Sequence, residues 1–509
     1  MNTLLKTMKE LDNIKLTEKG GVAYKSTLSD VYDMFALGGA YRSRTNADVA
    51  LQFKKAYMEN PTLALKCLFY LRDCREGQGE RRYFRVAYNW LCKNDSDKAG
   101  CLAPYVSEYG RWDDLIYATY NTPVWDTTIA ILESQLKLDM ECKTPSLLGK
   151  WMPSENASSI VTKATATKIR KSLGLTSREY RKMLSLLRKK INVVERLMSD
   201  NRWDEIEFDK IPSKAGLIYR NAFARRDLIA QKYREFATSE KTTVNAKTLY
   251  PYEVVNKALC NGKYEFFRYR YSYSYFKDMN DVERAMVNKY WENLPDYFNG
   301  SNNNMLCVVD TSGSMECSYN HSVRPIDVAI SLGIYAGERA GGPFKNHFVT
   351  FSTNPKLMTI EGIDFVDKVR GIYDKCIVET TNLTKVFDLF YDMVVSGRAK
   401  VEDLPSSIVI ISDMEIDSGC RNRFSGYGNY SAVSEMEKVR KKWDAADIPM
   451  PHLVYWNVEA RNDTILDLSA DVSYVSGFSP TVFKQVITGK TGIDLMLETL
   501  LSERYSVIK

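Results

Sequence analysis

Apolar residues recur along this chain in two patterns, and the change between them falls near residue 300. Before that point they repeat at helical spacing, as in 61–71, which follows a proline suited to a first helical turn. Glycines at 77 and 79 interrupt the pattern, which resumes over 80–91 with apolar residues on one face. We therefore expect residues 1–298 to be helical throughout.

After residue 300 short apolar runs alternate with segments of helical period. The runs typical of buried strands are 305–309, 344–351, 408–411 and 453–456, and the helical segments are 326–339, 432–446 and 491–504. Strands that alternate with helices of this length indicate βαβ units and a mostly parallel sheet covered on both faces. The fold class expected is an all-helical region followed by a doubly wound α/β domain over 299–509.

One tetrapeptide pattern occurs twice in the helical half. Arg111-Trp112-Asp113-Asp114 is similar to Arg202-Trp203-Asp204-Glu205, and an apolar residue follows each copy. An acidic residue at such a turn can cap a new helix. Two copies suit an array of stacked helical hairpins, in which each unit buries its apolar face against its neighbour.

Basic residues concentrate in the first half of the chain. Residues 1–300 hold 49 Lys and Arg against 37 Asp and Glu, whereas 301–509 hold 21 against 27. Residues 163–234 alone carry 19 basic and 8 acidic side chains. This asymmetry favours a polyanionic partner for the first half, and solvated helix faces are the alternative.

The number and spacing of the cysteines and histidines argue against several kinds of disulfide-bonded and metal-binding protein. Ten cysteines are scattered singly without a C-x-x-C pair, which fits thiols in a reducing cytosol rather than a disulfide framework or a zinc ribbon. Only three histidines occur, so histidine-rich metal sites are excluded. No apolar run is long enough to span a membrane, and residues 1–10 lack the apolar core of a signal peptide. We expect a cytoplasmic protein with no membrane partner.

Oxygen-bearing side chains follow the first apolar run. Asp310, Ser312 and Ser314 lie in the sequence D-T-S-G-S, and Asp413 follows the run at 408–411, separated from it only by Ser412. In open α/β sheets the carboxyl ends of the strands form the ligand-binding edge. Carboxylates and hydroxyls are hard donors, suited to Mg²⁺, Mn²⁺ or Ca²⁺. The expected cofactor is therefore Mg²⁺, with Mn²⁺ and Ca²⁺ as alternatives.

These residues resemble the metal-ion-dependent adhesion site of von Willebrand factor A domains. The resemblance implies Asp310, Ser312, Ser314, Thr381 and Asp413 as the metal ligands. Glu379-Thr380 stands where that family usually has glycines, and Met414 replaces a customary glycine. In such a site the metal can grip an acidic residue of a partner protein; a structural or internally closed metal site is the alternative.

The whole layout resembles the Ro, or TROVE, ribonucleoproteins, in which HEAT-like helical repeats precede an A domain. The phrases 71–81, 109–114 and 149–154 are similar to a related uncharacterised family of plants, amoebae and large viruses or phages. The resemblance implies a TROVE-like domain over 1–298 and a von Willebrand A domain over 299–509. It also implies a ring whose hole takes single-stranded RNA ends, with small structured RNA on its basic outer face.

Candidate RNA-binding residues come from two segments. The first is the basic stretch, from which we select Lys189, Lys190, Arg225 and Arg226. The second is an aromatic insert at 264–276, where alternating tyrosines and arginines would occupy opposite faces of a strand; the selected residues are Arg268, Tyr269, Arg270 and Tyr271. A hairpin that packs its tyrosines on the body of the protein is the alternative for the insert.

Enzymatic motifs are incomplete. Gly489-Lys490-Thr491 resembles the end of a phosphate-binding loop, but Lys484 stands where that motif needs glycine. A metal nuclease or phosphatase using Asp310, Asp413 and Glu415 is chemically conceivable. However, Ser312 occupies the position where a dehalogenase-type phosphatase needs an acid. We expect a non-enzymatic RNA-binding scaffold; the alternative is a protein–protein adaptor that uses the metal site without RNA.

Overall fold

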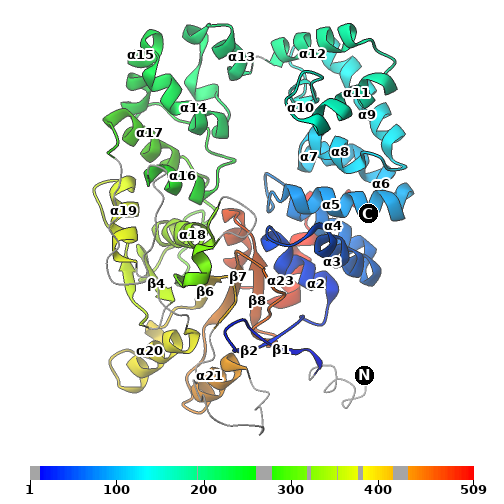
Figure 1. The fold of residues 1–509 in the computed structure, drawn as a ribbon. Helices are drawn as coiled ribbons and strands as arrows, with labels where there is room; N and C mark the ends of the chain where they lie inside the picture. Colours follow the sequence, from blue (N-terminus) through cyan, green and yellow to red (C-terminus); the bar gives the residue numbers. More distant parts are fainter. Residues whose placement is uncertain are drawn as a thin grey trace.

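Two stacks of helices stand side by side on an α/β part (Figure 1). The computed structural model describes residues 12–191, 193–259, 278–317, 323–351, 354–376, 382–416 and 434–509. Thr381 and the whole aromatic insert at 264–276 lie outside these ranges. No helix in the described ranges is long and apolar enough to cross a membrane.

The first stack contains helices α2 (Asp30–Leu37), α3 (Asn46–Glu59), α4 (Pro61–Arg72), α5 (Arg81–Asn94), α6 (Ser96–Leu102), α7 (Val106–Tyr109), α8 (Trp112–Thr119), α9 (Trp125–Glu141), α10 (Leu148–Trp151), α11 (Ile160–Ser172) and α12 (Ser177–Ile191). The second contains α13 (Val194–Ser199), α14 (Ser213–Arg225), α15 (Asp227–Thr238), α16 (Pro251–Ala258) and α17 (Asp281–Glu292). Helices that are close in sequence pack on one another, as α2 does on α3, α5 on α8 and α14 on α15.

Local signals place the helices that the sequence predicted. Asn60 accepts a hydrogen bond from the backbone N–H of Leu63, and Pro61 occupies the first turn of α4. The predicted segments 61–71 and 80–91 correspond to α4 and α5, so both predictions are confirmed.

Two expectations for the helical half are wrong. Strands β1 (Ile14–Leu16) and β2 (Val22–Tyr24) form an antiparallel hairpin, so this half is not helical throughout. The first R-W-D copy does begin α8, where Asp114 accepts from the backbone N–H of Arg111. The second begins only a 3₁₀ turn, Trp203–Glu205, because the chain then extends to bury Ile206 and Phe208 at alternate positions.

A six-stranded sheet forms the centre of the α/β part. Its order is β5-β4-β3-β6-β7-β8, and every neighbouring pair is parallel except β4 and β5. The strands are β3 (Met305–Asp310), β4 (His347–Phe351), β5 (Leu357–Thr359), β6 (Ser407–Ser412), β7 (His452–Asn457) and β8 (Val472–Ser476). The helices are α18 (Pro325–Arg339), α19 (Phe365–Lys375), α20 (Leu383–Val395), α21 (Glu435–Asp444), α22 (Phe483–Val486) and α23 (Gly492–Leu500). The expectation of a mostly parallel sheet is confirmed.

Some predicted boundaries in this part differ from the observed ones. The strand expected from residue 344 begins at His347, because Asn346 has φ +62° and breaks the extended chain. The helix expected over 491–504 ends at Leu500. Ser502 then donates its hydroxyl hydrogen to the carbonyl of Thr499, which competes with continuation of the helix.

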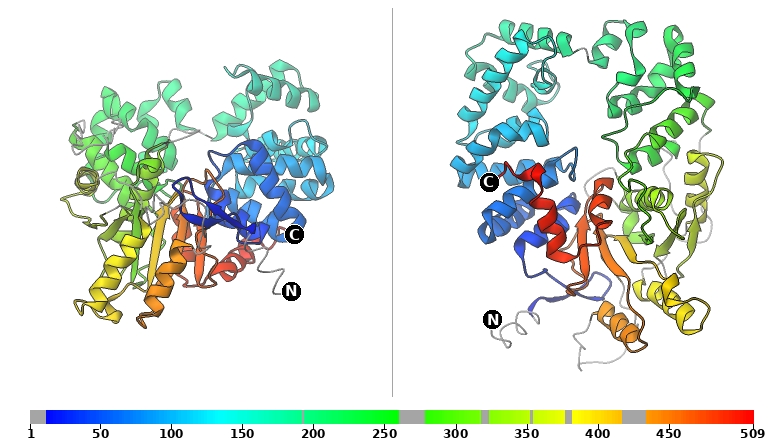
Figure 2. Two further views of the ribbon diagram at one scale, coloured as in Figure 1. Left: turned by 60° about the horizontal axis from the view of Figure 1, so that its bottom comes forward. Right: turned by 180° about the vertical axis from the view of Figure 1, so that it is seen from behind.

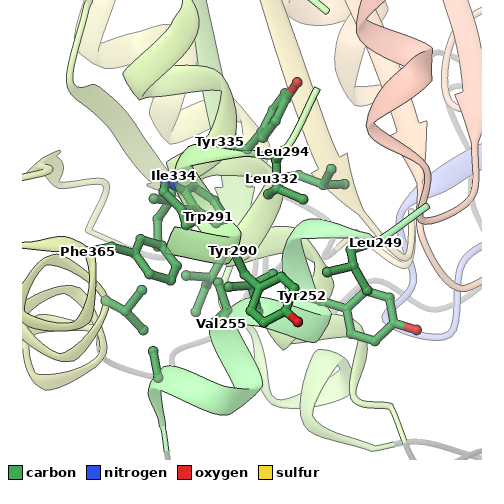
Figure 3. Packing of buried hydrophobic residues seen from close by; sticks show 14 of the residues in the cluster. Leu249, Tyr252, Val255, Tyr290, Trp291, Leu294, Leu332, Ile334, Tyr335 and Phe365 are labelled. Atoms are coloured by element: carbon green, nitrogen blue, oxygen red, sulfur yellow. The ribbon is translucent and has the colours of Figure 1, made fainter. Parts of the chain in front are cut away.

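The hydrophobic cores extend across the predicted boundary at 298/299. One face of the sheet packs with α18 and, through it, with α16 and α17 of the second stack; Figure 3 shows Trp291, Tyr335 and Phe365 in this core. The opposite face contacts α2 of the first stack together with α20 and α21. The α/β part therefore holds both ends of the helical array.

Candidate nucleic-acid interface and metal centre

Two buried aspartates meet where neighbouring strands end. Asp310 is the last residue of β3, and Asp413 follows β6, its parallel neighbour. The turn after β3 carries Ser312 and Ser314, whose Oγ atoms lie 3.0 Å apart. The structure thus brings together four of the five predicted metal ligands; Thr381 lies outside the described residues and stays a prediction.

Both carboxylates are held by directed hydrogen bonds. Asp310 accepts from the backbone N–H of Ser312 at 2.8 Å and from the hydroxyl of Ser412 at 2.6 Å. Burial raises the pKa of Asp310. Burial and the negative charge of Asp310 raise the pKa of Asp413 to about 6. Two buried carboxylates that repel each other in this way need a positive counter-charge when both are ionised.

The chain itself supplies positive charge to this pair. Arg461, in the loop after β7, donates from Nη2 to Oδ2 of Asp413 at 2.5 Å. The hairpin β1–β2 also covers this edge of the sheet. Its Glu18 forms an ion pair with Nη1 of Arg461 at 3.2 Å, and the positive charge of Lys19 lowers the pKa of both aspartates. None of these three residues was identified from sequence.

The donor set fits a hard divalent cation. All four described donors are carboxylate or hydroxyl oxygens, the ligands that Mg²⁺ and Ca²⁺ prefer. Among the described residues no group of three or more His, Cys, Asp or Glu is placed to hold a metal. A metal at this position would therefore depend on the hydroxyls of Ser312 and Ser314 as well as on the two aspartates.

A cavity of about 1050 Å³ lies between the two helical stacks and the α/β part. Its wall takes residues from the first stack (38–86, 111 and 150–151), the second stack (195–252) and the α/β part (479–481). The phrases 71–81, 109–114 and 149–154, singled out from sequence, all contribute lining residues. Segments more than 400 residues apart in the chain thus share one wall.

Positive charge dominates the cavity wall. Ten lining side chains are basic and two are acidic. Some of the basic ones are neutralised by carboxylates, as in the buried pair of Arg72 with Asp114 at 2.6 Å. Five basic residues form no ion pair with any residue that the structure describes: Arg75, Arg81, Arg82, Lys150 and Lys247. Partial burial and the positive charge of Arg111 lower the pKa of Arg81, as expected where basic groups crowd together.

Aromatic rings lie among these charges. The guanidinium of Arg111 stacks 3.8 Å from the ring centre of Trp151, and a bidentate pair with Asp113 holds the same guanidinium. Tyr219 and Tyr250 line the second-stack side of the wall and remain half-buried. Basic side chains beside accessible rings suit a flexible polyanion that carries flat bases.

None of the predicted RNA-binding residues that the structure describes lines this cavity. Lys189, Arg225 and Arg226 are exposed and do not line the cavity. Lys190 donates to the carbonyls of Asp139, Met140 and Cys142, and so caps the end of α9. Arg268, Tyr269, Arg270 and Tyr271 lie outside the described residues. The basic phrases 71–81 and 149–154 were the sequence signal that could have identified the cavity.

Known proteins match this chain in both halves. The model of a domain of unknown function, DUF2828, matches residues 17–98 and 149–301, and that of another, DUF7788, matches 304–503. The crystal structure of the Ro (RSR) protein of Deinococcus radiodurans aligns with a TM-score of 0.48 at 13% identity, over 93% of this chain and 99% of that one. An uncharacterized protein of Acanthamoeba polyphaga mimivirus, L728, is 29% identical over 531 residues, covering 94% of this chain and 85% of the viral protein. The chain is thus similar in sequence to this viral protein over nearly its whole length.

Proposed function

We propose that this protein is a non-enzymatic RNA-binding scaffold of the Ro type, and that the central cavity binds single-stranded RNA. The observation that supports this proposal most strongly is the charge of the cavity wall. Five basic side chains around this one cavity have no ion-pair partner among the residues that the structure describes. Phosphates would neutralise these charges, and bases would stack on Trp151, Tyr219 and Tyr250. In a duplex the flat faces of the bases are covered by stacking on neighbouring base pairs, so single strands fit this wall better than duplexes.

Charge reversal in the cavity tests the proposal. We expect Arg81→Glu combined with Lys150→Glu to lower the affinity for a fluorescein-labelled 20-nucleotide oligouridylate at least tenfold, because two phosphate contacts become repulsive. Fluorescence anisotropy measures the affinity. For the wild type we also expect a fall of about a hundredfold between 50 and 200 mM salt, if about five phosphates are contacted.

Exposed basic residues outside the cavity provide the matched control. Lys189→Glu combined with Arg225→Glu makes the same charge change, and we expect it to alter the affinity less than threefold. A reversed order of effects would place RNA on the outer face rather than in the cavity. RNA-free protein with unaltered partner binding would favour the adaptor alternative.

We further propose that Asp310, Ser312, Ser314 and Asp413, with Thr381 as the resemblance implies, bind one divalent cation, Mg²⁺ in the cell. A bound ion would neutralise the aspartates and could hold an acidic group of a partner protein. The four described residues supply the oxygens, and Ser412 orients Asp310. A cytoplasmic location remains a prediction that accompanies this proposal.

Thermal unfolding with and without cation tests the metal site. We expect 5 mM Mg²⁺ to raise the Tm of the wild type by a few degrees, because an ion bound only by the folded state stabilises it. Asp310→Ala should abolish the rise. Asp467→Ala removes a buried aspartate outside the proposed metal site, one that pairs with Arg440. This variant should still show the rise in Tm with Mg²⁺. Equal Tm values with Mg²⁺ and EDTA in the wild type would contradict the site.

A further inference from the structure

Arg461 occupies an unusual position for a charged residue. Only 9% of its side chain is exposed, and its guanidinium joins two acids from different parts of the chain. One is Asp413, at 2.5 Å and 1% exposed; the other is Glu18 of the hairpin, at 3.2 Å and 46% exposed. The hairpin is anchored beside them, since Thr17 donates to the carbonyl of Ile416 and the backbone N–H of Glu18 donates to Glu415.

This guanidinium lies where a bound cation would act. Oδ1 of Asp413 accepts from the backbone N–H of Glu415, and Oδ2 accepts from Arg461. A divalent cation and a guanidinium neutralise the same carboxylate, and they repel each other when both are close to it. Binding of the ion to Asp413 therefore requires Arg461 to withdraw from Oδ2 or to remain at an electrostatic cost.

We propose that Arg461 is an internal counter-ion that competes with the divalent cation for Asp413 and so sets the affinity of the site. The inference rests on the metal site proposed above and identifies the residue that regulates it. Glu18 keeps the guanidinium at the rim, so the N-terminal hairpin takes part in setting the affinity. In the absence of metal, Arg461 neutralises Asp413, and the positive charge of Lys19 acts on both buried aspartates.

Replacement of the guanidinium by an uncharged chain of similar length tests the inference. We expect Arg461→Met, in the full-length protein freed of metal, to bind Mn²⁺ at least about tenfold more tightly than the wild type by isothermal titration calorimetry. In EDTA this variant should melt at a lower temperature than the wild type. Mn²⁺ should abolish this difference in Tm, because the ion replaces the lost positive charge.

Arg440 offers a closely matched control. It also joins one buried and one exposed acid, Asp467 and Asp471, which are 7% and 56% exposed. We expect Arg440→Met to lower the Tm without restoration by Mn²⁺, and to leave Mn²⁺ affinity within twofold of the wild type.

The outcomes separate the two proposals. Wild-type binding of Mn²⁺ that Arg461→Met leaves unchanged or weakens would overturn the role of Arg461 while the metal site stands. Tight binding by Arg461→Met with weak or no binding by the wild type supports it. Absence of binding in both proteins would overturn the metal site and this inference together, and retention of binding by Asp413→Asn would show that the ion is bound elsewhere.

Discussion

Met414 follows the buried Asp413. The metal site of von Willebrand factor A domains, which this site resembles, usually has glycine at that position. The φ of Met414 is +63°, so the backbone keeps the left-handed conformation that favours glycine. That conformation costs a non-glycine residue about 1–2 kcal/mol. The side chain is 1% exposed, however, and loss of a buried methionine costs roughly 2–5 kcal/mol. Burial therefore outweighs strain, and the loop keeps its conformation without glycine.

Asp33 of α2 makes the stability of the protein depend on pH. Burial raises its pKa to about 6, although Oδ1 accepts from the backbone N–H of Thr27. Because the pKa in the folded state exceeds the unfolded value, this group stabilises the fold below about pH 4, and that contribution is lost as the pH rises through 6. We expect the unfolding free energy of Asp33→Asn, relative to that of the wild type, to be about 1–3 kcal/mol higher at pH 7.5 than at pH 4.

Urea unfolding of both proteins at the two pH values measures this difference. The amide oxygen of asparagine can still accept the bond from Thr27, so the comparison isolates the charge. A difference in unfolding free energy that does not change with pH would contradict the assignment.

At the scale of elements, the short helix α10 carries Lys150 and Trp151 into the cavity wall. It packs on α12 through Gly149, where an added Cβ would lie 2.6 Å from Cβ of Leu187. We expect Gly149→Ala to cost about 1–3 kcal/mol, because the two helices must separate. Since the same movement displaces Lys150 and Trp151, affinity for oligouridylate should fall as well. Thermal unfolding and anisotropy measure the two effects.

Gly100 in α6 is the control for this substitution. An added Cβ at this helical position would have no atom of another part of the chain within 4 Å. We expect Gly100→Ala to stabilise the protein by about 0.5–1 kcal/mol with no effect on RNA affinity. Equal behaviour of the two variants would mean that the contact between α10 and α12 is unimportant.

At the scale of the whole molecule, the C-terminal segment joins the α/β part to the first helical stack. Figure 2 shows α23 beside the helices of that stack. Beyond it, Arg504 pairs with Asp73 at 2.8 Å, and Tyr109 donates its hydroxyl hydrogen to the carbonyl of Arg504 at 2.5 Å. Lys66 donates to the carbonyl of Tyr505 at 2.7 Å.

Removal of the buried Asp73, which links the C-terminal segment to the first helical stack, should destabilise the whole molecule. Asp73 is fully buried and accepts from both Arg504 and the hydroxyl of Tyr505. We expect Asp73→Ala to cost roughly 2–4 kcal/mol, because Arg504 loses its buried partner. Glu108 pairs with the same arginine at 3.2 Å but is 56% exposed, so Glu108→Ala should cost less than about 1 kcal/mol. Equal losses of unfolding free energy in urea would contradict a role for the buried pair.

Local patterns were sufficient for the strands and helices that bury apolar faces. The runs at 305–309 and 408–411 are β3 and β6, and they end in the polar residues from which the metal site was predicted. Such elements follow from the spacing of near neighbours along the chain. The two R-W-D copies show the limit of this reasoning, since the same residues begin a helix at one position and a 3₁₀ turn at the other.

The amino-acid order therefore established the alternation of elements, the excess of basic residues before residue 300 and the oxygen donors at two strand ends. Only the tertiary structure decided which basic residues face one cavity, and that Arg461 and the N-terminal hairpin lie against Asp413. The physical reason is the sequence separation of the residues involved. Periodicity depends on residues that are close together in the sequence. The cavity wall, which combines residues from 38 to 481, exists only when both ends of the helical array pack on the same sheet.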